Sequence, residues 1–254
     1  MLDFILIAIT VLTWNTGRMG QYAKPEKNEV LQYLVRQDAD VICLQEVDVY
    51  KDAQFLTLPD VKAALGKKYP YSYLDFAIYD KRHQYGTMVW SKYPIIHKQS
   101  IHYKTIGNIS NRCDIVVAKD TIRLINNHLE SYNFIAEDLN DMDKLKAKWL
   151  RALPLRNEQA RVVRKEIDES PYPVIVVGDF NSIELSYAYW HISRGLHDAW
   201  RSTHLLEWGG TCEHRGWTFR IDYILSTETL VPTACEVVET PGSDHKPVVA
   251  TLEW

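Results

Sequence analysis

Apolar positions along the chain form short runs that are typical of buried strands, and these alternate with amphipathic stretches. The clearest run is Val174–Val177, where four consecutive β-branched residues indicate a strand buried on both faces. The runs Phe4–Leu12 and Asp40–Glu46 predict two more buried strands, the first ending at Asn15. About 20 apolar residues are needed to cross a bilayer, so Phe4–Leu12 is too short for a membrane helix.

Helical spacing of apolar residues predicts four helices, over residues 26–37, 60–68, 136–170 and 184–193. The third should be interrupted at Pro154, because proline cannot continue a helix without a kink or break. Further strands are predicted over residues 71–78, 86–91, 95–103, 112–118, 122–128, 218–225, 234–238 and 247–252. Such crowded strands, with tight connections such as Ala118–Thr121, imply antiparallel pairing in addition to crossover units.

The composition is that of a folded globular protein without an overall attraction for polyanions. Hydrophobic residues make up 46% of the 254 residues and charged residues 24%, so extensive disorder is not expected. The formal net charge of -4 gives no global pull toward nucleic acid. A polyanionic substrate would therefore have to be held by a local basic patch or by a metal ion.

The four cysteines form no CxxC pair, which argues against a zinc ribbon or a redox motif. Cys43 and Cys113 lie in predicted strands and are interpreted as buried thiols, while a bridge between Cys212 and Cys235 remains open. Four of the eight tryptophans fall between residues 190 and 217, where core and loop packing is favoured over a platform for substrate.

Acids, amides and histidines close or interrupt several predicted strands. Each has a structural explanation when taken alone; Asp222, for example, can pair with Arg220. Their joint occurrence favours a shared site, because polar residues in buried strands cost stability unless they are paired or bind metal. The candidate residues are Asn15, Glu46, His128, Asp179, Asn181, Asp222, Asp244 and His245.

Six motifs in order resemble those of the endonuclease/exonuclease/phosphatase superfamily, also called the deoxyribonuclease-I-like fold. They are TWN at 13–15, LQEVD at 44–48, NNHLES at 126–131, GDFNS at 178–182, RIDYI at 220–224 and SDHKPV at 243–248. The resemblance implies one α/β (α+β) domain over residues 1–254, a four-layer sandwich of two packed mixed β-sheets flanked by helices. It also implies divalent-metal-dependent hydrolysis of phosphate esters, usually with Mg²⁺ and with Mn²⁺ as a substitute.

The chemistry of phosphate esters explains why these residue types would gather. An anionic phosphodiester repels an anionic nucleophile until a hard cation neutralises its oxygens, and hard cations prefer oxygen ligands. We therefore expect Glu46 to be the principal metal ligand, with Asn15 and Asp244 nearby through direct or water-mediated contacts.

The remaining candidates are expected to act on water and phosphate. Asp179 would orient and deprotonate the attacking water, and Asn181 would hold that water or a phosphoryl oxygen. Asp222 would fix the tautomer of His245, whose positive charge would stabilise the transition state. His128 would contact the phosphate from the other side or assist the leaving group. Asp179 and the His245–Asp222 pair both remain candidates for the general base.

Two further residues are weaker candidates for phosphate contact. Arg112 opens the predicted strand before NNHLES, a place where related enzymes often carry such a residue, and Tyr85 is as well explained by structure. Residues 144–165 contain eight basic residues and one acid, for which a solvated helix face is favoured over a phosphate-binding patch.

The substrate stays open between several classes. HLES and Arg112 are similar to tyrosyl-DNA phosphodiesterases, so a nucleic-acid phosphodiester is placed ahead of sphingomyelinase-like or inositol-phosphate substrates. A non-catalytic binding protein of this fold would lack at least one of the acids or histidines, and none is missing. A serine hydrolase would need a GxSxG nucleophile elbow, which the chain lacks. We expect a monomer without a transmembrane segment, cytoplasmic unless the natural chain extends beyond this N-terminus.

Overall fold

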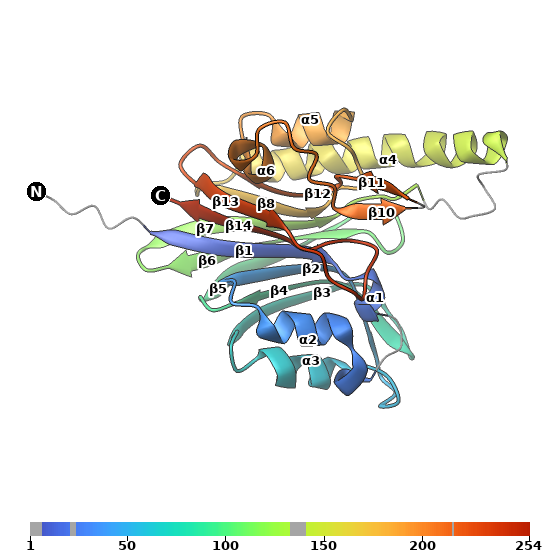
Figure 1. The fold of residues 1–254 in the computed structure, drawn as a ribbon, viewed down its shortest axis with the longest axis vertical. Coiled ribbons are helices and arrows are strands. Elements are labelled where there is room, and N and C mark those ends of the chain that lie inside the picture. The colour runs from blue at the N-terminus through green and yellow to red at the C-terminus, as the bar shows by residue number, and fades with distance from the viewer. Residues whose placement is uncertain (1–6, 21–23, 133–140, 215) are drawn as a thin grey trace, which may run out of the picture.

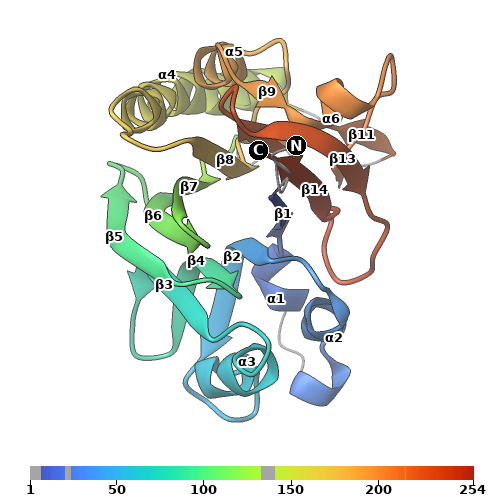
Figure 2. The same ribbon diagram turned by 90° about the vertical axis from the view of Figure 1, so that its left-hand side faces the viewer.

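Two six-stranded mixed sheets lie face to face with helices on their outer faces (Figures 1 and 2), in a computed structural model that describes residues 7–20, 24–132, 141–214 and 216–254. This four-layer arrangement confirms the predicted fold class. Part of the run Phe4–Leu12 and the start of the predicted helix at 136 lie outside the described residues. Among the described helices, none has both the length and the hydrophobicity that crossing a bilayer requires.

The first sheet has the strand order β13-β14-β1-β2-β4-β3. Its central strands β1 and β2 run parallel, and every other pair is antiparallel. The strands are β1 Ala8–Asn15, β2 Val41–Tyr50, β3 Tyr71–Tyr79, β4 His83–Ser91, β13 Val231–Val237 and β14 Val248–Glu253.

The second sheet has the order β5-β6-β7-β8-β12-β9, and here β7 and β8 are the parallel pair. Its strands are β5 Ile95–His102, β6 Ile109–Val117, β7 Asp120–His128, β8 Val174–Asp179, β9 His197–Asp198 and β12 Asp222–Ser226. A separate hairpin, β10 Cys212–His214 and β11 Trp217–Phe219, takes the place of the first half of the strand predicted over 218–225.

Three apolar clusters hold the layers together. One fills the space between the sheets, with Val11, Val41 and Val177 among its fully buried members. A second lies between the first sheet and its helices, and a third between the second sheet and the helices that cover it. The helical segments are α1 Gly17–Gly20, η1 Pro25–Lys27, α2 Glu29–Arg36, α3 Leu58–Leu65, α4 Met142–Asp168, α5 Tyr187–Ser193 and α6 Ala199–Thr203.

A polar layer crosses the space between the sheets near the strand ends. Asn126 on β7 accepts a hydrogen bond from Gln45 Nε2 at 2.6 Å and donates to the Leu44 carbonyl at 3.2 Å, both on β2. Asn111 on β6 donates to Thr87 Oγ1 of β4 at 2.9 Å. These bonds fix the two sheets relative to each other, since a buried amide is costly unless it is paired.

Two elements continue past the point where the sequence predicts an end or a break. The second strand does not end at Glu46, because β2 continues to Tyr50 after a bulge between Leu44 and Val47. Helix α4 continues through Pro154 without interruption, and this proline lies on the exposed side of the helix. There the carbonyl that loses its helical partner can bond to water, which lowers the cost of the proline.

The open questions about cysteine and tryptophan are also answered. All four cysteines are buried free thiols, so Cys212 and Cys235 do not form a bridge. Core packing is confirmed for Trp200, which is 9% exposed, and is wrong for Trp190, Trp208 and Trp217, which are 61%, 55% and 73% exposed.

Candidate active site

Two parallel strand pairs bring the predicted residues to one end of the sandwich. In the first sheet Asn15 pairs with Gln45, and in the second His128 pairs with Asp179. Parallel strands finish at the same edge of a sheet, so both pairs deliver their last side chains together. Asp222 joins them because it begins β12 directly opposite Asp179.

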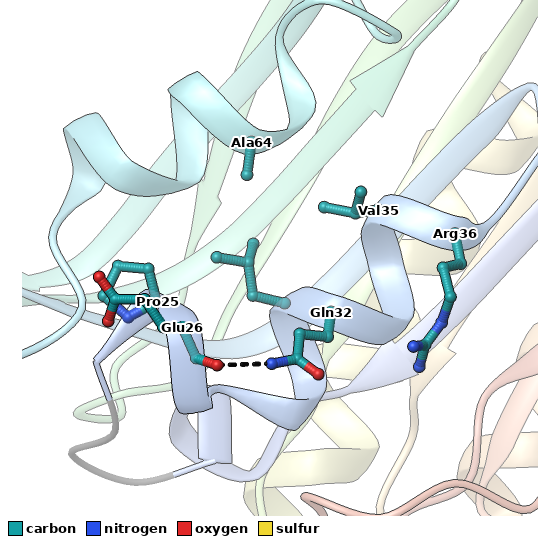
Figure 3. Close-up of a pocket in the computed structure, with 7 residues that line it drawn as sticks. Pro25, Glu26, Gln32, Val35, Arg36 and Ala64 are labelled. Atoms are coloured by element: carbon teal, nitrogen blue, oxygen red, sulfur yellow. Dashed lines mark hydrogen bonds between the residues drawn. The ribbon is translucent and has the colours of Figure 1, made fainter.

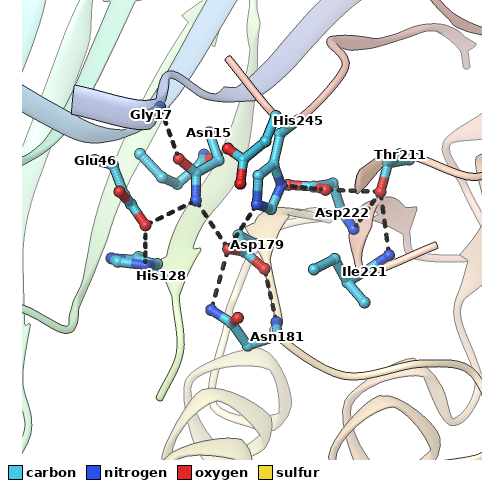
Figure 4. A network of polar contacts seen from close by, with 12 residues as sticks. Asn15, Gly17, Glu46, His128, Asp179, Asn181, Thr211, Ile221, Asp222 and His245 are labelled. Atoms are coloured by element: carbon cyan, nitrogen blue, oxygen red, sulfur yellow. Dashed lines mark hydrogen bonds and ion pairs between the residues drawn. The ribbon is translucent and has the colours of Figure 1, made fainter. Parts of the chain in front are cut away.

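Asn15 connects the two halves of the cluster, as Figure 4 shows. Its Nδ2 donates to Asp179 Oδ2 at 2.9 Å and to Glu46 Oε1 at 3.2 Å, and its Oδ1 accepts from Gly17 N at 3.1 Å. Glu46 has a φ of 50° at the bulge of β2. A bulge re-aims a side chain that would otherwise follow the alternation of the strand, and here it accompanies a carboxylate that reaches Asn15.

Asp222 orients His245 and is itself fixed by a hydrogen bond from Thr211. His245 Nδ1 lies 2.8 Å from Asp222 Oδ2, which also accepts from Thr211 Oγ1 at 2.7 Å. Ser243 fixes the backbone on the other side, accepting from His245 N at 3.1 Å and donating to the Asn15 carbonyl at 2.8 Å. The imidazole orientation is therefore set by three different segments (Figure 4).

Asp179 and Asn181 form a tight turn after β8. Asn181 donates from its backbone to Asp179 Oδ1 at 2.7 Å and from Nδ2 to Asp179 Oδ2 at 3.1 Å. His245 Nε2 lies 4.0 Å from Asp179 Oδ2, and His128 Nε2 lies 3.4 Å from Glu46 Oε1. The latter is an ion-pair contact that lacks the geometry of a full hydrogen bond. Carboxylates and imidazoles thus alternate across the cluster.

Comparison with known proteins identifies the family of the chain. The family model described as Endonuclease/Exonuclease/phosphatase family matches residues 12–245. The chain belongs to this family. No curated protein sequence gives a significant match.

Solved structures of the same fold cover nearly the whole chain at low sequence identity. An endonuclease/exonuclease/phosphatase from Beutenbergia cavernae is 18% identical with a TM-score of 0.73, covering 96% of this chain and 71% of its own. Sphingomyelinase C from Streptomyces griseocarneus is 19% identical with a TM-score of 0.65, covering 96% and 99%. A humanized D. rerio TDP2 is 18% identical with a TM-score of 0.68, covering 96% and 98%. Identities this low show a shared fold and do not select a substrate.

The two principal carboxylates of this family member have opposite pKa shifts. Burial favours the neutral form of Glu46, but contact with His128, the hydrogen bond from Asn15 and the charge of His245 outweigh it and lower the pKa to about 2. Burial raises the pKa of Asp179 to about 6, and the charge of Asp222 adds to the effect while His245 and His128 oppose it. Glu46 therefore stays ionised at neutral pH, whereas Asp179 binds a proton more readily than an ordinary aspartate does.

Both histidines favour the protonated form. Burial alone would lower the pKa of His245, but the charges of Asp222 and Asp179 hold it well above its usual range. For His128, contact with Glu46 likewise outweighs burial and raises the pKa. Two histidines whose pKa values are raised thus lie among the three acids Glu46, Asp179 and Asp222.

The oxygen donors suit a hard divalent cation. Glu46 is ionised and its side chain is 27% exposed, and Asp244 is exposed. Asn15 faces Glu46 with its Nδ2, and its amide oxygen, which accepts from Gly17 N, is the atom that could bind a cation. Carboxylate and amide oxygens are the ligands that Mg²⁺ and Mn²⁺ prefer. A carboxylate oxygen of Asp244 lies within 4.8 Å of a ring nitrogen of His245, so this acid belongs to the same region.

A cavity of about 270 Å³ opens beside Glu46 and His128. Tyr85, Arg18 and Asn108 also line it, and the ring of Tyr85 lies edge-on to His128 at 6.4 Å. Burial raises the pKa of Tyr85, so its hydroxyl keeps its proton and can donate a hydrogen bond. The structure therefore brings Tyr85 to the site.

A larger pocket of about 530 Å³ lies between α2 and α3 (Figure 3). Gln32, Val35 and Ala64 line it, and Gln32 donates to the carbonyl of Glu26 at 2.7 Å. None of the candidate catalytic residues is among its lining residues, so we place the chemistry at the smaller cavity.

Arg112 is not brought to the cluster. It lies within β6 rather than at its start, and its Nη1 forms an ion pair with Glu166 of α4 at 2.7 Å. The expectation that Arg112 contacts phosphate is therefore wrong, because its guanidinium pairs with the helix that covers the sheet.

Sequence reasoning missed the residues that support the cluster. Thr211 and Ser243 bond to it through hydroxyl groups, and Arg18 reaches the cavity from a left-handed backbone with a φ of 61°. The fully buried Arg156 donates to the carbonyls of Glu130 and Asn181, which joins the segments after β7 and β8. Arg156 stood in the basic run of residues 144–165, but that pattern gave no signal that it was buried.

Proposed function

We propose that this protein is a divalent-metal-dependent phosphodiesterase. The observation that carries the proposal is the bonding of Asn15 to both Glu46 and Asp179, with the His245–Asp222 pair beside them. These residues come from both sheets, and their carboxylates and imidazoles meet in one buried cluster. A structural salt-bridge network would not need a partly exposed, firmly ionised glutamate at a cavity.

Glu46, Asn15 and Asp244 would hold the metal, which is Mg²⁺ or Mn²⁺ by the chemistry of their oxygens. When bound, this ion supplies positive charge that offsets the charge of the phosphoryl oxygens. The negative charge of Glu46 is preserved for that purpose by its lowered pKa.

The protein residues divide the proton chemistry between them. With a pKa of about 6, Asp179 is ionised at neutral pH and can take a proton from water as the water oxygen attacks phosphorus. Asn181 holds the Asp179 carboxylate in place. This favours Asp179 over His245 as the general base, because the raised pKa of His245 keeps it protonated.

His245 and His128, whose pKa values are both raised, would face developing negative charge in their protonated forms. His245, oriented by Asp222, would stabilise the phosphoryl oxygens in the transition state. His128 would serve the same charge from the Glu46 side or donate a proton to the leaving oxygen as its bond to phosphorus breaks.

A nucleic-acid phosphodiester is the favoured substrate. The N-terminal half of α4 carries the exposed cations Lys144, Lys146 and Arg151, and Figure 1 shows this half reaching beyond the sheets. Arg151 forms an ion pair at 2.8 Å with Glu130, two residues after His128. Exposed cations beside a catalytic strand end suit a chain of phosphates.

A lipid phosphodiester is the second candidate, for one reason. Leu205, Leu206, Trp208 and Trp217 are 86%, 92%, 55% and 73% exposed. Trp208 donates to the Thr218 carbonyl at 2.9 Å, so this loop lies against the β10–β11 hairpin beside Thr211. Clustered apolar side chains of this size can enter a membrane surface.

Hydrolysis of bis-p-nitrophenyl phosphate tests the reaction. We expect activity with Mg²⁺ or Mn²⁺, its loss on chelation, and a fall of roughly a hundredfold or more in Glu46→Ala and His245→Ala. Glu228→Ala, which removes an exposed carboxylate from the turn between β12 and β13, is the control and should keep its rate. Unchanged rates in both site variants would refute the proposal.

A substrate panel then separates the candidates. Single-stranded DNA, 5'-tyrosyl DNA, sphingomyelin vesicles and inositol phosphates are compared by kcat/KM with the same metal. A preference for DNA supports the favoured substrate, and a preference for sphingomyelin supports the second. Equal and feeble turnover of all four would contradict both.

A further inference from the structure

Cys212 lies directly beside His245, although no step of the proposed reaction uses a thiol. The two residues form a β-bridge between the start of β10 and the segment before β14. Backbone bonds flank this bridge, from Glu213 N to the Asp244 carbonyl at 2.9 Å and from Lys246 N to the Thr211 carbonyl at 2.6 Å. The two segments are therefore held in register.

This register gathers three metal-binding groups of different kinds. The Cys212 sulfur, a carboxylate oxygen of Asp244 and a ring nitrogen of His245 all lie within 4.8 Å of one another. Ligand atoms around tetrahedral zinc are about 3.5 Å apart, given bond lengths of roughly 2.0–2.3 Å, so shifts of about 1 Å would close the set. Sulfur, nitrogen and oxygen together suit Zn²⁺, whereas Mg²⁺ avoids sulfur.

The surroundings resemble those of zinc-binding histidines. Such a histidine usually holds a carboxylate with the ring nitrogen that does not bind the metal. His245 Nδ1 lies 2.8 Å from Asp222, which leaves Nε2 as the nitrogen for zinc. Asp222 is fixed in turn by Thr211, the neighbour of Cys212. Cys212 and His245 are 8% and 7% exposed, while Asp244 is exposed and leaves the site open to solvent.

We propose that Cys212, Asp244 and His245 form a zinc site, and that Zn²⁺ bound there inhibits hydrolysis. Binding forms a zinc–thiolate bond and releases the thiol proton to solvent. Inhibition follows because zinc withdraws His245 from the phosphate and Asp244 from the magnesium ligands. The inhibitory effect rests on the proposed function, whereas zinc binding does not.

Cobalt absorption tests the site without any measurement of activity. Co²⁺ bound to a thiolate gives an intense near-ultraviolet charge-transfer band. We expect this band in the wild-type protein, its displacement by Zn²⁺ but not by excess Mg²⁺, and its loss in Cys212→Ser. Cys235→Ser is the matched control, because Cys235 is also buried, at 3% exposure, but lies on β13 in the core between the sheets. It should keep the band.

Protection of Cys212 from alkylation supplies a measurement that needs no variant. Zn²⁺ should slow the labelling of Cys212 in the wild type at least about tenfold, as located by mass spectrometry. No cobalt band and no protection in the wild type would overturn the site, whatever the activity.

Zinc inhibition is then measured at saturating Mg²⁺, with each rate divided by that protein's own zinc-free rate. The half-inhibiting Zn²⁺ concentration should rise at least about tenfold in Cys212→Ser and stay unchanged in Cys235→Ser. Equal inhibition of all three proteins would overturn the inhibitory role and place the zinc elsewhere. Absence of hydrolysis without zinc would refute the proposed function, while the cobalt band would still decide the site.

Discussion

Gly178 is the residue that lets β7 and β8 approach each other at the candidate site. Its φ is +118°, and a Cβ built on it would lie 2.1 Å from the carbonyl oxygen of Asn127. Only glycine combines that backbone angle with so close a contact. The next residue is Asp179, so the carboxylate that we propose as the general base depends on a neighbour without a side chain.

Gly178→Ala should lower the free energy of unfolding by about 3 kcal/mol, because it adds a backbone clash to an unfavourable φ. Urea unfolding followed by tryptophan fluorescence measures the change. Gly195→Ala is the control: Gly195 also has a positive φ, of +74°, but a Cβ added there would meet no atom within 4 Å, so the cost should be about 1 kcal/mol. Equal losses in the two variants would show that the contact with Asn127 is not limiting.

At the scale of elements, α4 changes character along its length. Its C-terminal half packs Ala160, Val163 and Ile167 against the second sheet, whereas most of the residues from Met142 to Arg151 are exposed. This exposure fits the solvated helix face expected for the basic run, and it also leaves the basic residues where a polyanion could contact them.

Lys144→Glu combined with Lys146→Glu should lower kcat/KM for single-stranded DNA about tenfold and reduce the slope of log kcat/KM against log salt by roughly 1–2. Hydrolysis of bis-p-nitrophenyl phosphate should not change, because this small substrate cannot reach the helix. Lys62→Glu combined with Lys67→Glu makes the same change of charge at and just beyond α3 and serves as the control. A similar loss in both double variants would mean that net charge, rather than α4, determines DNA turnover.

At the scale of the whole molecule, the site depends on how the two sheets are aligned. Glu46 belongs to one sheet and Asp179 to the other, and Asn126 and Gln45 join the sheets just behind them. Apolar contacts fix the distance between sheets but allow sliding, whereas hydrogen bonds have a direction. The polar layer is therefore the part of the core that sets the register between the sheets.

Asn126→Leu should lower the free energy of unfolding by about 2–3 kcal/mol, since it leaves the buried amide of Gln45 without this partner. Gln45→Leu should also lower the free energy of unfolding. Its effect in the Asn126→Leu background should be at least about 1 kcal/mol smaller than in the wild type, because both partners are then apolar. A double-mutant cycle by urea unfolding measures this coupling. Additive losses would show that the two amides stabilise the protein independently.

Much of the fold was predictable because it follows local pattern. The β-branched run before Gly178 predicted β8, and helical spacing predicted α2 and α3 to within a few residues. The predicted strand end at Glu46 and the predicted helix break at Pro154 were wrong for the same reason. Whether a strand continues past a bulge, or a helix past a proline, depends on what the neighbouring elements bury or leave to water.

The sequence by itself determined which residues are candidates for the chemistry, because acids and histidines at the ends of apolar runs are recognisable from their neighbours. Only the tertiary structure decided which of them meet. Asn15 and Asp179 are 164 positions apart, and Arg112 turns away to Glu166, which lies 54 positions further along. Parallel pairing and the alignment of the sheets create such contacts, and no local pattern encodes them.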